Sequence, residues 1–136
     1  LTYYSLPQLG VTTTPLTPLG RTFFHTPPSH PGHLRIQQHH RRGVSTTPPG
    51  FSELLAGKQS FLSRSGTILT FQGHPEKDAQ CAKMRLYDAV RWFGVDPNDR
   101  ETLKKYEEAM ELPHDGREIW VRVLEWVREK TPEIHL

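Results

Sequence analysis

The stretch "ILTFQGHPEKDAQ", residues 68–80, joins an apolar run with the composition of a strand to a Gly-His-Pro-Glu turn. After Glu76 the apolar residues recur with the period of a helix, and the recurring residues are Ala82, Leu86, Ala89, Val90 and Phe93. A turn that leads from a strand into a helix is where α/β enzymes place catalytic groups. The stretch therefore predicts an α/β fold and makes His74 and Glu76 candidate site residues.

The segments before this turn have the composition of short strands. Residues 9–16 are rich in β-branched side chains and residues 34–40 alternate in the period of a strand, so each predicts a strand. Residues 59–63 and 67–72 are separated by turn residues and predict a hairpin. After the first strand we expect a turn with a short strand and then a Pro-rich exposed loop, over residues 17–24 and 25–33.

Residues 97–136 are rich in Glu, Lys and Arg and carry two further helical patterns. The apolar stripe of the first pattern comprises Leu103, Tyr106 and Met110. The second pattern begins with Asp115, three residues before Glu118 in the manner of a capping box, and its stripe comprises Ile119, Val123, Trp126 and Val127. We therefore expect short strands followed by three helices.

Length and charge limit the classes of protein to consider. A chain of 136 residues is long enough for one domain with one core. The formal net charge is +2 and the acidic and basic residues are interspersed, so we expect no nucleic-acid partner and no anionic membrane surface. No apolar run approaches the roughly 20 residues of a membrane span, and the first residues lack the features of a signal peptide.

Two further features concern the origin of the chain. Cys81 is the single cysteine, which rules out an internal disulfide and favours a reducing, cytoplasmic compartment. The chain begins with Leu1 rather than with methionine, which favours the back portion of a longer protein.

His74 and Glu76 have complementary chemistry. Imidazole exchanges protons near neutral pH, and a nearby carboxylate can hold its tautomer and stabilise the imidazolium that forms. Gly73 admits close approach of another backbone, and Pro75 restricts how the chain leaves His74. From these residues alone a second interpretation stays open, in which His74 marks a helix entry and Glu76 is a favourable charge in the first turn.

The segment "TFQGHPE", residues 70–76, resembles the histidine-glutamate motif of class I glutamine amidotransferases, which has the pattern aromatic-Gln-x-His-Pro-Glu. Four other segments are similar to the stand-alone fungal members of that family, relatives of the amidotransferase domain of GMP synthase: residues 9–20, 36–44, 48–55 and 85–94. The resemblance implies the C-terminal portion of a flavodoxin-like three-layer domain over residues 1–96. Residues 97–136 are then a helical C-terminal extension.

The same resemblance implies a chemistry. In the family a cysteine thiolate attacks the amide of glutamine, forms a glutamyl thioester and releases ammonia, which an acceptor consumes. His74 is then the base and later the acid, Glu76 orients it, and His39 and His40 lie near the edge of the glutamine pocket. The substrate is glutamine or a γ-glutamyl compound, no cofactor is expected, and the acceptor or partner protein is not identified. By residue type alone, residues 39–42 also fit a solvated strand end.

The nucleophile of the family has no counterpart before the motif. Its Gly-x-Cys-x-Gly-x-Gln elbow precedes His-Pro-Glu, yet residues 1–73 contain no cysteine. Cys81 follows the motif on the predicted helix, which carries it away from the turn, and we expect it to be a small apolar residue between helix and sheet. His39, His40, His74 and Glu76 could chemically form a metal site. Their spacing matches none of the usual zinc-binding patterns, so no metal site is expected.

Three functions stay open. In the first, the chain belongs to a glutamine amidotransferase-like protein whose thiol lies elsewhere, and it lacks glutaminase activity alone. In the second, it is a non-catalytic module that docks a partner through Trp120 and Trp126, although Trp126 lies on the apolar stripe and also fits a core position. In the third, the complete protein is a γ-glutamyl peptidase.

Overall fold

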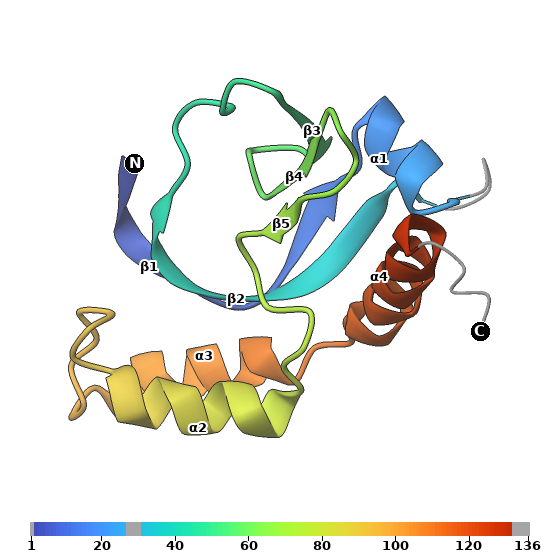
Figure 1. Ribbon diagram of the computed structural model, residues 1–136. Coiled ribbons are helices and arrows are strands. Elements are labelled where there is room, and N and C mark those ends of the chain that lie inside the picture. The colour runs from blue at the N-terminus through green and yellow to red at the C-terminus, as the bar shows by residue number, and fades with distance from the viewer. Residues whose placement is uncertain (1, 27–30, 132–136) are drawn as a thin grey trace.

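The computed structural model describes residues 2–26 and 31–131, and the chain in it mixes strands and helices (Figure 1). The elements in chain order are β1 (Thr2–Pro15), α1 (Pro18–Phe23), β2 (His33–Gly43), β3 (Phe51–Leu55), β4 (Ser60–Ser63), β5 (Leu69–Phe71), α2 (Ala79–Ala89), α3 (Arg100–Met110) and α4 (Gly116–Lys130). Three helices follow the strands, as predicted, and the short helix α1 lies between β1 and β2.

The two longest strands form one curved antiparallel ribbon (Figure 1). β1 pairs with β2 from Thr2 opposite Gly43 to Pro15 opposite His33. The strands β3, β4 and β5 form a separate antiparallel sheet in that order. A bridge from Leu16 to the last residue of β3 joins the end of the ribbon to this second sheet.

Different elements cover the two sides of the ribbon (Figure 1). On one side α2 and α3 pack against β1, and this cluster comprises Leu9, Ala82, Leu86, Phe93, Val95, Leu103 and Met110. The other cluster joins β2, β3 and α4, and comprises Leu16, Leu34, Ile36, Leu55 and Ile119. Both C-terminal helices therefore pack against the strands, while the domain boundary after residue 96 stays a prediction.

The predicted strands over residues 9–16 and 34–40 correspond to β1 and β2, and the predicted hairpin corresponds to β4 and β5. The prediction of a turn and short strand over residues 17–24 is wrong, because α1 forms there. Thr17 accepts a hydrogen bond from the Gly20 N–H through its side chain, and Pro18 starts the helix, where its missing N–H costs nothing. Of the predicted loop, residues 27–30 lie outside the described residues.

The start of α4 is fastened to β2 by Asp115. The predicted capping box is wrong, because the Asp115 side chain makes no cap hydrogen bond. Its carboxylate instead accepts hydrogen bonds from the backbone N–H and the guanidinium of Arg35, each at 2.7 Å. The Asp115 N–H donates to the Arg35 carbonyl at 2.8 Å. A long-range contact has therefore replaced the local one.

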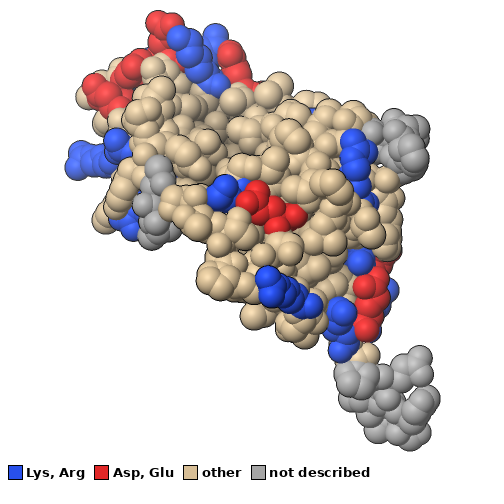
Figure 2. All heavy atoms as spheres, turned by 90° about the horizontal axis from the view of Figure 1, so that it is seen from above, with Lys and Arg blue, Asp and Glu red and all other residues tan. Residues whose placement is uncertain are grey.

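Charged side chains do not gather into one broad surface on the face shown in Figure 2. There, Lys and Arg lie in small groups, several beside Asp or Glu, around a wide uncharged area. Among the residues that the structure describes, no helix has both the length and the apolar character needed to cross a membrane.

Candidate functional site

The Gly-His-Pro-Glu turn leaves β5 and runs against β2. The His74 N–H donates a hydrogen bond to the Gln37 carbonyl at 2.8 Å. A Cβ at Gly73 would lie 2.9 Å from atoms of Ile36, Gln37 and Gln38, closer than side chains tolerate. Glycine therefore lets the turn approach the strand, and the strand fixes the position of His74.

His74 and Glu76 are hydrogen-bonded to each other. The His74 Nδ1 and the Glu76 Oε1 are 2.7 Å apart, and both side chains remain partly open to solvent. A neutral imidazole that donates from Nδ1 to the carboxylate presents Nε2 as a proton acceptor. Within the described part of the chain, no hydrogen bond involves that Nε2. The pair can therefore accept a proton at Nε2 while Glu76 balances the charge that forms.

His39, on β2, lies beside His74. The two ring centroids are 6.3 Å apart with the rings nearly perpendicular, and Phe93 packs 5.2 Å from the His39 ring on another side. Only 7% of His39 is exposed, and neither ring nitrogen has a hydrogen-bond partner among the described residues. A buried polar group without a partner costs free energy, so this ring is unusual within the molecule.

His40 belongs to a neighbouring cavity. Its Nε2 donates to the Gln38 side-chain carbonyl at 2.8 Å, and its ring lies 5.8 Å from that of Tyr4. The cavity has a volume of about 370 Å³, and its lining comprises Tyr3, His40, Arg41, Arg42, Gln72, Trp92 and Phe93. The structure thus brings His39 to His74 but places His40 on the far side of a shared aromatic wall.

A cavity of about 390 Å³ opens beside His74 and His39. Its remaining lining residues are Lys77, Arg85, Trp92 and Phe93. Sequence reasoning missed this set. The eight-residue spacing of Lys77 and Arg85, about two helical turns, is the one signal that points to a shared face. Nothing in the sequence separates the exposed Trp92 from the tryptophans of α4.

The surroundings of His39 oppose its protonation. Burial, followed by the charges of Lys77, His74 and Arg85, lowers the pKa of His39 to about 4. Burial also lowers the pKa of His40 and that of Lys77. His39 is therefore neutral near pH 7 and offers one N–H donor and one acceptor nitrogen.

No family model matches the chain, but two curated relatives carry the same description. The glutamine amidotransferase-like protein chry6 of Gibberella zeae is 30% identical over 130 residues, covering 90% of this chain and 47% of chry6. The glutamine amidotransferase-like protein chyE of Penicillium rubens is 29% identical over 114 residues, covering 84% of this chain and 45% of chyE. A glutamine amidotransferase structure from Thermotoga maritima superposes with a TM-score of 0.56 at 19% identity, covering 92% of this chain and 53% of that one.

The chain is class I glutamine amidotransferase-like. The family and the fold class expected from the "TFQGHPE" segment are therefore confirmed, with the sheets and helices forming part of a flavodoxin-like arrangement. The chain spans about half the length of the curated relatives it matches. The structural likeness, at 19% identity, shows a shared fold alone.

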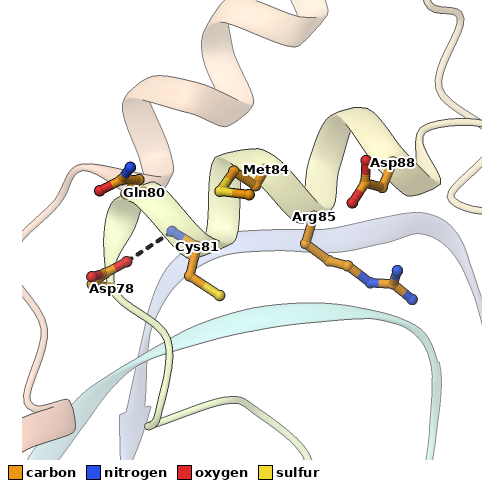
Figure 3. A pocket seen from close by; sticks show the side chains of 6 residues that line it. All are labelled: Asp78, Gln80, Cys81, Met84, Arg85 and Asp88. Carbon is orange, nitrogen blue, oxygen red and sulfur yellow. Dashed lines mark hydrogen bonds between the residues drawn. The ribbon is translucent and has the colours of Figure 1, made fainter.

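In this amidotransferase-like chain Cys81 is not the apolar interface residue that we predicted. Figure 3 shows it on α2, and its thiol is exposed. The neighbouring Ala82 is fully buried in its place, because one residue turns a helix by about 100°. Cys81 lines a separate surface cavity with Asp78 and Arg85 and is not part of the lining around His74.

The same amidotransferase-like chain offers no evident metal site in its described residues. Nowhere in residues 2–26 and 31–131 do three or more His, Cys, Asp or Glu side chains gather closely enough to hold a metal ion. The Nδ1 of His74, which the alternative metal site would use, is already bonded to Glu76. The chemistry that this arrangement supports is proton transfer.

Proposed function

We propose that this chain supplies the histidine and the carboxylate of a Cys-His-Glu triad to a protein that hydrolyses the amide of glutamine. The observation that carries the proposal is the 2.7 Å hydrogen bond between His74 Nδ1 and Glu76 Oε1, in a turn that β2 holds in place. His74 takes the thiol proton at Nε2 and then delivers it to the departing ammonia. Glu76 keeps the ring oriented and stabilises the imidazolium.

The nucleophilic thiol comes from a segment outside residues 1–136. Residues 1–73 contain no cysteine, and Cys81 does not line the cavity of His74. The thiolate attacks the amide carbon, and ammonia leaves as the glutamyl thioester forms. Water then hydrolyses the thioester to glutamate with His74 as the base. This chain alone therefore has no glutaminase activity.

The cellular setting is part of the same proposal. The free, exposed thiol of Cys81 fits a reducing compartment, which supports a cytoplasmic location. The substrate is a small molecule that carries a glutamyl amide.

The first test is the intact mass of the native protein, recovered from its source with an antibody against residues 97–131. We expect a mass well above the 15.7 kDa of this chain. A native mass of 15.7 kDa would rule out a thiol supplied by the same polypeptide.

The second test measures glutamine hydrolysis by that native-length protein. We expect His74→Ala to lower kcat by about 10³-fold or more, with little change in stability because the side chain is partly exposed. His33→Ala, on the same strand ribbon but away from the turn, is the matched control and should keep wild-type kcat. Full activity in His74→Ala would refute the triad.

A further inference from the structure

The helix α4 carries apolar side chains on two faces. Its inner face packs against β2 through Ile119, and Trp126 on that side donates a hydrogen bond from its indole N–H to the Gly66 carbonyl at 3.1 Å. The outer face of α4 comprises Trp120, Val121, Leu124 and Val127. Between 41% and 54% of each of these residues is exposed, and Figure 1 shows α4 at one edge of the molecule. Covering a core requires only the inner face, so the outer face has no role in the fold of the described residues.

The four apolar residues of the outer face form one continuous patch. Residues three and four apart are neighbours on the surface of a helix. Trp120 and Val121 therefore lie one turn before Leu124, and Val127 lies one turn after it. A continuous exposed apolar patch of this kind marks a surface that binds another molecule.

Charged residues of both signs border this patch. Arg117 and Arg128 lie before and after the four apolar residues, and Glu118 lies at the edge of the face. In the part of the chain that the structure describes, none of these three side chains forms an ion pair within 4.0 Å. The buried Arg122, by contrast, pairs with Glu129 on the inner side. The charges around the patch can therefore pair with groups of another molecule.

The order of these residues is complementary to itself in the antiparallel sense. Leu124 lies four residues after Trp120 and four residues before Arg128. When two copies of α4 pack head to tail at Leu124, Arg128 of one copy lies level with Trp120 of the other, as a cation beside an aromatic ring. Glu118 of that other copy lies about 3 Å further along the axis, on the same side of the helix pair as Arg128. A parallel pair would instead place each arginine beside its own copy.

A cavity of about 430 Å³ lies along the edge of the outer face that carries Glu118. Its lining comprises Phe24, His25, Arg117, Glu118, Val121, Arg122 and Glu125. Arg122 is already bonded to Glu129 and to the Phe23 carbonyl. Two carboxylates beside an aromatic wall suit the guanidinium and the aliphatic stem of an arginine. In the antiparallel pair Arg128 of the second copy lies on this side.

We propose that the outer face of α4 is a self-association surface, on which a second copy of this protein packs its own α4 antiparallel about Leu124. The interface is isologous, so Arg128 of each copy reaches the cavity beside Glu118 of the other. The inference does not depend on the proposed function, because no residue of α4 lines the cavity of His74.

The test is sedimentation velocity of the native-length protein. We expect a dimer at about 100 μM, and Leu124→Glu should weaken self-association at least about tenfold because two carboxylates then meet at the centre of the interface. Met84→Glu, which places the same charge at an exposed apolar residue of α2, is the matched control and should remain dimeric. Circular dichroism checks that both variants keep the fold.

Two results of this experiment would overturn the inference. A wild type that stays monomeric at about 100 μM would mean that another part of the polypeptide or a different partner covers the outer face. A dimer that Leu124→Glu leaves unchanged would mean that the copies meet through another surface.

Charge reversal tests the antiparallel arrangement. Arg128→Glu and Glu118→Arg should each weaken the dimer about threefold or more. The double variant restores the pair with its signs exchanged, so it should recover most of the wild-type affinity. A double variant as weak as the two single changes combined would refute the antiparallel packing about Leu124.

Discussion

The polar side chains near the two ends of β2 differ in their hydrogen bonding. Near its start, Arg35 and Asp115 exchange backbone and side-chain hydrogen bonds that fasten α4 to the strand. Near its end, His39 is buried with neither ring nitrogen bonded to a described residue. The chain itself supplies the hydrogen-bond partners of Arg35, and these contacts hold α4 against β2. His39 instead lines a cavity with Lys77 and Arg85.

This difference shows how to separate structural from functional polar groups on one strand. A buried polar group costs free energy unless it is bonded. The partly buried Arg35 and Asp115 are bonded to each other within the chain, so changes there should alter the free energy of unfolding. His39 has no such partner among the described residues, so changes there should alter ligand binding and the pH dependence of stability more than the fold.

Gly73→Ala, in the turn that packs against the middle of β2, should have the largest effect on the free energy of unfolding. The new Cβ would lie 2.9 Å from Ile36, Gln37 and Gln38, so the turn must move away from β2. We expect a loss of about 2–3 kcal/mol in the free energy of unfolding, measured by urea denaturation. Gly57→Ala is the control, because nothing lies within 4 Å and only its φ of +68° opposes a side chain. Equal losses in both variants would show that contact with β2 does not decide the position of the turn.

Near the start of β2, Asp115→Ala should lower the free energy of unfolding, because it removes the acceptor of the Arg35 backbone N–H and guanidinium. Asp99→Ala, which removes an ordinary, solvent-exposed cap hydrogen bond to Thr102 in α3, should lower the free energy of unfolding by less. Thermal or urea unfolding of the two variants gives the comparison directly. A smaller loss for Asp115→Ala would mean that the contact with β2 contributes less than a local cap.

Because of His39, near the end of β2, the free energy of unfolding should fall as the pH falls. The pKa of His39 is lowered from 6.5 to about 4 in the fold, so between these values the unfolded chain binds more protons than the folded one. His39→Gln should therefore lose less stability than the wild type between pH 7.5 and pH 5. We expect a difference of about 1 kcal/mol, smaller than the full shift implies because the cavity is open to solvent.

Urea midpoints at the two pH values measure this effect, and His33→Gln, on the same strand, is measured beside it as the matched histidine replacement. Burial also lowers the pKa of His40, so some acid sensitivity should remain in His39→Gln. An identical pH dependence of wild type and His39→Gln would show that His39 is not held neutral by the fold.

Local pattern was enough to predict much of the molecule. The strands β1 and β2, the hairpin of β4 and β5, and the three later helices follow from side-chain periodicity, which acts over neighbouring residues. The contact of His74 with Glu76 could also be anticipated, because the two residues share one turn. The helix α1 was missed because a proline that looked like a turn residue starts a helix there.

The sequence by itself determined the alternation of strands and helices, the His74–Glu76 pair and the resemblance to amidotransferases, because each depends on residues close together in the chain. Only the tertiary structure decided that Asp115 binds Arg35 rather than capping its own helix. It alone placed the thiol of Cys81 on the surface and gathered Lys77 and Arg85 around His39. The physical reason is that burial and long-range contacts depend on how separate elements pack, which no local spacing specifies.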